Sequence, residues 1–296
     1  MHALSRQQLI LLVLLTLVWG INWPIMKLGV TGFPPLSFRS MSMWLGLPVL
    51  AGVLLWRKVP FRIGREHWPE LLLLTVFNML FWHTLAILAV QSLSSGRAAI
   101  LGYTMPVFSA LVGSIWFGQK LAGRAWGGVA AAALGVVLLL WHEITALTGR
   151  PQGVAMMLVA AATWALGTQL MRRTGIPHPT LALSFWMTLL TTLWMSVMAV
   201  LFERGAWTAP SPTVWWSVVY NALGVFAFAQ VAWLSLARDL PPIASTLSVM
   251  FIPVLGVFSG AWWLDEVLHW QDWAAVGLVV VAIFAVLGRA ASTRAP

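Results

Sequence analysis

Uncharged and mostly apolar runs occupy almost the whole chain, and short charged segments separate them. Each run is long enough, or nearly so, for the roughly 20 apolar residues that cross a bilayer as a helix. The runs cover residues 7–26, 40–56, 71–96, 98–119, 125–142, 151–171, 174–202, 205–237, 240–264 and 273–288. They do not alternate between apolar and polar positions, as the strands of a membrane barrel do. The pattern predicts an all-α integral membrane protein with ten transmembrane helices.

One segment of the chain occurs twice, because residues 97–129 match residues 244–276 at a constant offset of 147. Seven of the 33 ungapped positions are identical, namely Pro106/Pro253, Val107/Val254, Gly113/Gly260, Trp116/Trp263, Leu121/Leu268, Trp126/Trp273 and Val129/Val276. A fixed offset of about half the chain indicates an internal duplication. We therefore predict two five-helix repeats, residues 1–147 and 148–296, within one transport domain. An odd number of helices per repeat gives the second repeat inverted topology, as in many secondary transporters.

The basic residues predict how the chain is oriented in the membrane. With the N-terminus inside, twelve of the 17 Lys and Arg residues fall on the inner side and at most five on the outer side. This bias predicts that both termini are cytoplasmic. It also explains the net charge of +9, which favours anionic lipid headgroups over nucleic acid as partners.

The composition excludes several other classes of protein. Only 8% of the residues are charged, against about 25% in soluble domains. The absence of cysteine removes disulfides and thiolate metal sites, and we expect neither a metal nor a cofactor. No His-Glu-x-x-His, no Gly-x-Ser-x-Gly and no acidic pair within a run is present, which disfavours an enzyme. The acidic side chains after the ninth run are expected to lie in a solvated loop; they are Asp265, Glu266 and Asp272.

Polar residues in the middle of apolar runs are the first candidates for a substrate site. His83 lies mid-run, and at the offset of 147 its counterpart is Gln230. An imidazole is costly in hydrocarbon, so it should face protein or water. A helix–helix hydrogen bond and a substrate contact both explain such a pair. Asn78 lies in the same run as His83.

Tryptophans in the middle of runs are the second kind of candidate. Trp19 and Asn22 are three residues apart and therefore share a helix face, and Trp164 follows Trp19 by 145 residues. Lipid-facing bulk and an aromatic-lined cavity both explain mid-run tryptophans, and this symmetry favours the cavity for Trp19 and Trp164. Trp186 lies in the seventh run.

Two prolines predict bends in the cavity wall. Pro106 and Pro253 each remove one helical hydrogen bond, which a membrane tolerates where a wet cavity or a neighbouring group compensates. Tyr103 lies beside the first proline, and Ser245 precedes the second. Arg39, near the start of the second helix, is expected to extend to the interface rather than to contact substrate.

These features together resemble the drug/metabolite transporter superfamily, in its EamA-like branch. The resemblance rests on the Trp-x-x-Asn segment, on the proline-centred fourth and ninth helices, and on Trp263-Leu264-Asp265-Glu266 with its echo Trp116-Phe117-Gly118-Gln119. Gln119 departs from the glutamate of that signature. The resemblance implies a central cavity, whose lining would include Trp19, Asn22, Asn78, His83, Tyr103, Trp164, Trp186, Gln230 and Ser245. Within the branch, the tryptophan content and His83 resemble bacterial inner-membrane exporters of aromatic and neutral amino acids.

The expected function is therefore export of neutral or aromatic amino acids, or similar small metabolites, by alternating access. Coupled carriers usually keep an ionisable relay within the membrane, and no run has a central Asp or Glu. Facilitated export is expected, with proton coupling through His83 as the alternative. Export of lipophilic cations or drugs is the rival function. The sequence leaves the oligomeric state open, and a monomer is compatible with it.

Overall fold

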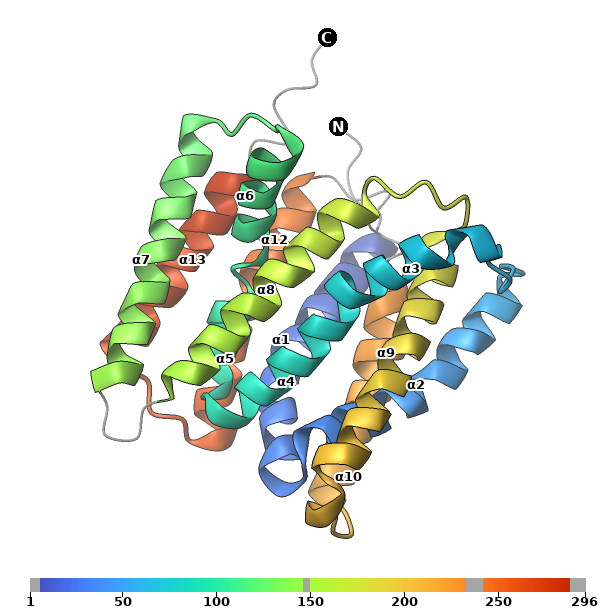
Figure 1. The fold of residues 1–296 in the computed structure, drawn as a ribbon. Helices are drawn as coiled ribbons and strands as arrows, with labels where there is room; N and C mark the ends of the chain where they lie inside the picture. The colour runs from blue at the N-terminus through green and yellow to red at the C-terminus, as the bar shows by residue number, and fades with distance from the viewer. Residues whose placement is uncertain (1–5, 146–149, 233–241, 288–296) are drawn as a thin grey trace.

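A computed structural model of the chain (Figure 1) describes residues 6–145, 150–232 and 242–287, except for the side chains of residues 143, 242–249, 286 and 287. Every regular element in the described residues is a helix. Eight helical stretches are long and apolar enough to cross a membrane, namely Arg6–Gly32, Pro35–Trp56, Arg65–Ser92, Ser95–Phe117, Gly123–His142, Pro151–Met171, Thr180–Ala206 and Pro212–Ala232. The shorter apolar helices Met250–Leu264 and Trp270–Ala285 follow them. The all-helical membrane class is thus confirmed, and the ten-helix inverted repeat stays a prediction.

Seven of the described helices run without interruption. They are α1 (Arg6–Gly32), α2 (Pro35–Trp56), α7 (Gly123–Thr145), α8 (Pro151–Met171), α9 (Thr180–Phe202), α12 (Pro242–Leu264) and α13 (Trp270–Leu287). A short 3-10 turn, η3 (Arg204–Ala206), follows α9. Several of these helices begin with proline in the first turn, where its missing N–H has no helical partner to lose.

The other helical stretches are composite. The third contains the 3-10 turn η1 (Arg65–His67), α3 (Trp68–Thr75), the π-helical segment η2 (Val76–Leu80) and α4 (Phe81–Ser92). The fourth consists of α5 (Ser95–Gly102) and α6 (Met105–Phe117). The eighth begins with α10 (Pro212–Val219) and continues as a second π-helical segment, η4 (Tyr220–Ala229). A π segment within a helix is rare and often marks a functional position.

Helices from the two predicted repeats pack against each other throughout the molecule. At one edge α7 lies beside α13 (Figure 1), and α2 packs against both α9 and η4. In the interior α1 packs against α12, while α8 packs against α4 and α6. Large apolar side chains remain exposed on the outside, for example Trp262 (84%) and Ile115 (71%). Such a surface is expected where lipid rather than water surrounds the helices.

The two prolines predicted to break helices differ in the structure. The fourth stretch is interrupted at Tyr103 and Thr104, directly before Pro106. In contrast, α12 continues through Pro253 without a break. A proline inside a helix removes one hydrogen bond and can kink the helix without ending it. A helix interruption is therefore present in the first repeat, and a bend at Pro253 stays a prediction.

Candidate functional site

Arg39 lies one turn inside α2, and only 4% of the residue is exposed. Its Nη1 donates to Oδ1 of Asn221 in η4 at 3.3 Å, and its Nη2 donates to Sδ of Met26 in α1 at 2.8 Å. The guanidinium carbon is 5.6 Å from the centre of the Phe226 ring. The expectation that Arg39 extends to the interface is wrong. Since α2 begins at Pro35, Arg39 lies a full turn inside the helix, and its side chain contacts α1 and η4.

The charge of Arg39 has no acidic partner among the described side chains. No carboxylate there forms an ion pair with it, and its Nε has no hydrogen-bond partner. The neighbouring cations are engaged differently. Lys27 donates to the carbonyl oxygens of Val90, Gln91 and Leu93, where α4 ends. Arg97 pairs with Asp272.

His83 lies in the first turn of α4, directly after η2, and 9% of it is exposed. Its ring centre is 5.4 Å from that of Phe226, so His83 and Arg39 share this aromatic neighbour. Gln230 directly follows η4 and is partly buried. The two polar residues that the duplication pairs therefore each follow a π segment. No pattern in the sequence indicates the π segments, because neither composition nor periodicity distinguishes them from α-helix.

The middle of α1 brings polar and aromatic side chains into the interior. Asn22 is 7% exposed, and its Oδ1 has no hydrogen-bond partner. Trp23, 4% exposed, meets Tyr103 edge-on with ring centres 6.3 Å apart. Tyr103 lies at the break between α5 and α6. Sequence reasoning missed Trp23, although it follows Trp19 by four residues and so lies on a neighbouring part of the same face.

Asn78 and Trp164 lie on two helices that contact each other. Asn78 belongs to η2, and its Nδ2 donates to Oγ1 of Thr168 in α8 at 3.4 Å. The backbone of Asn78 lies so close to Gly167 that a side chain at that glycine would collide with it. Trp164, also on α8, is partly buried, as is Trp19 on α1. The pair at positions 78 and 168 thus joins the π segment to α8.

Trp186, a predicted site residue, does not join the interior around Arg39 and Trp23. Trp186 donates from Nε1 to the carbonyl oxygen of Phe61 at 2.6 Å, and its ring centre is 5.4 Å from that of Trp68. Trp186 therefore packs against the link between α2 and α3, away from Arg39 and Trp23. The side chain of Ser245 lies outside the described residues.

Two hollows flank the end of α1 at which α2 begins. The larger, about 660 Å³, is lined among others by Val30, Leu36, Thr84 and Glu203. The smaller, about 420 Å³, is lined among others by Lys27, Thr213 and Glu266. None of the predicted site residues lines either hollow. The lining of the larger hollow includes Leu36, three residues before Arg39 in α2, and Thr84, which directly follows His83.

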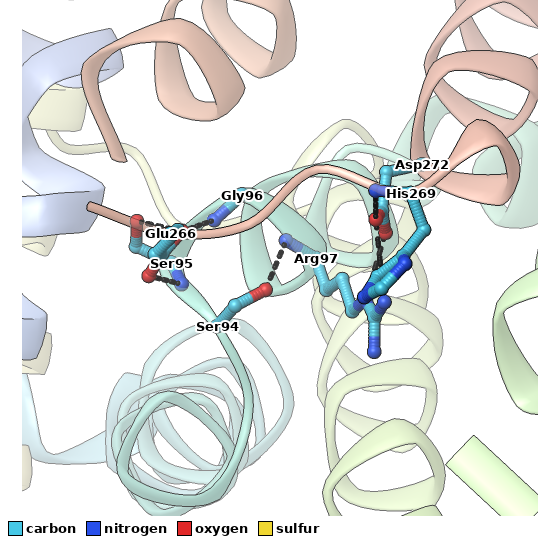
Figure 2. Close-up of polar contacts among 7 residues, drawn as sticks. All are labelled: Ser94, Ser95, Gly96, Arg97, Glu266, His269 and Asp272. Atoms are coloured by element: carbon cyan, nitrogen blue, oxygen red, sulfur yellow. Dashed lines mark hydrogen bonds and ion pairs between the residues drawn. The ribbon is translucent and has the colours of Figure 1, made fainter. Parts of the chain in front are cut away.

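Acidic side chains bind the first turn of α5 (Figure 2). The carboxylate of Glu266 accepts hydrogen bonds from the backbone N–H groups of Ser95 and Gly96, at 2.6 and 3.1 Å, and from the Ser95 hydroxyl at 2.9 Å. Asp272, 2% exposed, accepts from Arg97 Nε at 2.7 Å and Nη2 at 3.2 Å. Charged acceptors at a helix start are favoured by the helix dipole.

The expectation of a solvated loop after α12 is therefore wrong for Glu266 and Asp272, and only Asp265 is exposed. A second carboxylate binds the start of α2 in the same way. Glu203, 9% exposed, accepts from the backbone N–H groups of Leu36 and Ser37 at 2.9 and 2.7 Å, and from the Ser37 hydroxyl at 2.7 Å. We call the contacts of Glu203 and of Glu266 the two carboxylate clamps.

Comparison with known protein families finds the EamA-like transporter family in two stretches of the chain, residues 7–141 and 151–288. The "Probable amino-acid metabolite efflux pump" of Escherichia coli K12 is 24% identical over 294 residues, covering 95% of each chain. The uncharacterized inner membrane transporter YedA of the same strain is 28% identical over 273 residues, covering 91% of this chain and 87% of YedA. A solved crystal structure, 20% identical, has the same fold with a TM-score of 0.69, covering 98% of this chain and 100% of that one.

Proposed function

The chain belongs to the EamA-like transporter family, and from this premise we propose that it exports neutral or aromatic amino acids, or similar small metabolites, by alternating access. Membership confirms that the protein is a multi-pass membrane transporter and not an enzyme. The substrate, the direction of transport and the mechanism are parts of the proposal. So is its place in the bacterial inner membrane with both termini cytoplasmic. In support of that orientation, α1 begins and α13 ends at the same end of the molecule (Figure 1).

The residues in the interior between α1, α2, α4 and η4 are the main support for the proposed class of substrate. Aromatic rings lie there together with polar atoms that lack partners, the Oδ1 of Asn22 and the Nε of Arg39. Buried polar atoms are nearly always hydrogen-bonded in native proteins. A small solute with an apolar side chain and polar ends would supply both sets of contacts. The efflux pump of Escherichia coli, which carries amino-acid metabolites by its name, supports the same class.

The arrangement of the helices supports alternating access between two inverted repeats. The π segments η2 and η4 occupy positions that the offset of 147 equates. The contact of α1 with α12 has its counterpart in that of α8 with α6. Rocking of one repeat against the other around a central site is the general mechanism of such folds.

Facilitated transport, without a coupling ion, is the proposed energetic mode. The acidic side chains that the structure describes lie at or beyond helix ends, among them Glu70, Glu203 and Glu266. Ion- and proton-coupled carriers usually keep such groups within the membrane. Coupling to protons through His83 is the alternative, because its imidazole is buried beside Phe226, the ring that Arg39 also contacts.

The test is flux of radiolabelled phenylalanine and leucine from proteoliposomes without an ion gradient. We expect flux in the wild type, a reduction of about tenfold or more in Trp23→Ala, and little change in Trp262→Ala, whose side chain is 84% exposed. A loss of one aromatic contact near 1.4 kcal/mol corresponds to the tenfold change. Efflux of tetraphenylphosphonium without flux of any amino acid would instead identify an exporter of lipophilic cations. Uphill accumulation driven by a pH gradient alone would refute the facilitated mode.

A further inference from the structure

We infer that Arg39 is the residue that binds the carboxylate of the transported solute. This inference rests on the proposed function and adds two points to it. The solute must have a carboxylate group, and Arg39 is the residue that binds this group. Four observations of the surroundings of Arg39 support this role.

The first observation is the cost of burying Arg39 without an acidic partner. A buried guanidinium normally lies next to a carboxylate, because removing its charge from water costs several kcal/mol. The described neighbours of Arg39 are an amide oxygen, a thioether and an aromatic ring. These groups orient the guanidinium and leave its charge uncompensated. A residue that is kept at such a cost is expected to serve a ligand of opposite charge.

The second observation is which edge of the guanidinium is free. Asn221 holds Nη1, whereas Nε has no partner and Nη2 has only a thioether, which is a weak acceptor. Arg97 shows how the same edge is used elsewhere in this chain, since its Nε and Nη2 bind the two oxygens of Asp272. This paired geometry is the strongest that arginine makes with a carboxylate. Arg39 offers that edge, and no carboxylate of the described residues binds it.

The third observation is an acceptor suited to the other end of an amino acid. Asn22 lies one turn before Met26 on α1, about 6 Å along the helix, and Met26 contacts Arg39. The Oδ1 of Asn22 is buried without a donor. An ammonium group would satisfy it. A zwitterion therefore matches both unpaired atoms, a donor on Arg39 and an acceptor on Asn22.

The fourth observation is a route to the site. On α1, Val30 lies one turn beyond Met26. On α2, Leu36 lies three residues before Arg39 and nearer the same end of the molecule. Both residues line the hollow of about 660 Å³. Along α1 and α2, the lining of the hollow is thus about one helical turn from Met26 and from Arg39, at the end where α1 finishes and α2 starts.

The experiment compares phenylalanine with phenethylamine, the same molecule without its carboxylate, in proteoliposomes containing wild type, Arg39→Met or Asn221→Asp. Met has a similar length and no charge. Asn221→Asp has nearly the same shape and places a carboxylate against Nη1 of Arg39, so that it compensates the charge that would otherwise attract the carboxylate of the solute. We expect both variants to reduce phenylalanine flux about tenfold or more, the equivalent of one charge-assisted pair. Phenethylamine flux should stay within about twofold of the wild type.

Thermal stability separates recognition from folding. Asn221→Asp supplies the missing counter-charge, so its melting temperature should equal or exceed that of the wild type while its phenylalanine flux falls. Flux of phenylalanine unchanged in both variants, or an equal loss of phenylalanine and phenethylamine flux, would overturn the role of Arg39. Absence of amino-acid flux in the wild type would instead overturn the proposed function, and this inference with it.

Discussion

The ends of α6 and α12 have the same backbone geometry and different charges. At the offset of 147, both helices are followed by a residue in the left-handed region, Gly118 with φ of 64° and Asp265 with φ of 50°. The next side chain in each case, Gln119 or Glu266, folds back over a glycine six residues earlier, where any side chain would collide with it. The glycines are the duplicated pair at positions 113 and 260.

The two ends differ in what they bind. Glu266 and Asp272 bind the first turn of α5, whereas the matching positions of the first repeat hold Gln119 and Ala125. The amide of Gln169, from α8, lies next to the glycine beneath Gln119. The duplicated backbone therefore determines where the chain turns after α6 and α12. The charged side chains determine how strongly each of these ends binds the adjacent helix. We expect the end of the molecule that carries Glu266 to open at the greater cost.

The largest effect is expected from Asp272→Ala, which copies the residue of the first repeat. Arg97, 9% exposed, would lose the carboxylate that its Nε and Nη2 bind, and breaking such a buried pair costs about 3–5 kcal/mol. The melting temperature in detergent should fall markedly. The double variant Asp272→Ala with Arg97→Met should recover most of the loss, because no unpaired charge remains. If the double variant is as unstable as the single one, the ion pair is not what joins α13 to α5.

A smaller effect is expected from Glu266→Gln, which turns the second end into a copy of the first. The charged acceptor is replaced by a neutral one, at a cost of up to about 1.5–3 kcal/mol. Since the chain has no cysteine, a single Thr213→Cys in the smaller hollow can report opening through labelling by a polar maleimide. Labelling should be faster in the variant. Equal rates would mean that the Glu266 clamp does not limit access at this end.

The smallest effect is expected from Asp265→Gly, which copies Gly118. A non-glycine residue is sterically strained in the left-handed region, and the strain is smaller for aspartate than for most residues. The variant should be more stable by at most about 1 kcal/mol, and the reverse exchange Gly118→Asp should destabilise by a similar amount. Calorimetry on the two purified variants measures both values. Two shifts of the same sign would contradict the equivalence of the two helix ends.

The sequence predicted the fold class because the apolar runs are long and free of charge, and it misplaced the helix ends because charge alone does not set them. Residue 97 was taken as the boundary between two spans, whereas α5 begins at Ser95 and contains Arg97 in its first turn. Its partner Asp272 is 175 residues away. A pairing at that separation in sequence depends on how the helices pack, and no local sequence pattern predicts it.

The candidate site was predicted only in part, again because the helix ends and the long-range contacts were not known from the sequence. His83 was expected to face protein or water, and it is buried beside Phe226. Arg39 was misassigned, because a basic residue next to an apolar run normally indicates the membrane interface. Only the start of its helix and its contacts show that Arg39 is buried. Trp186 was included by resemblance and by its position in the run, and it bonds to the link between α2 and α3 instead.

The π segments have a consequence for how this chain can change in length. Each π turn holds one residue more than an α-helical turn, so loss of one residue there restores ordinary helix and leaves Gln230 on its face. The same deletion within α9 would rotate every later position by about 100°. The offset between repeats shifts from 145 at Trp164 to 147 at Pro253, across a stretch that contains η4, the longer of the two π segments. Insertions and deletions among homologous chains are therefore expected mainly in these two helices, because there they leave the later residues on the same helix faces.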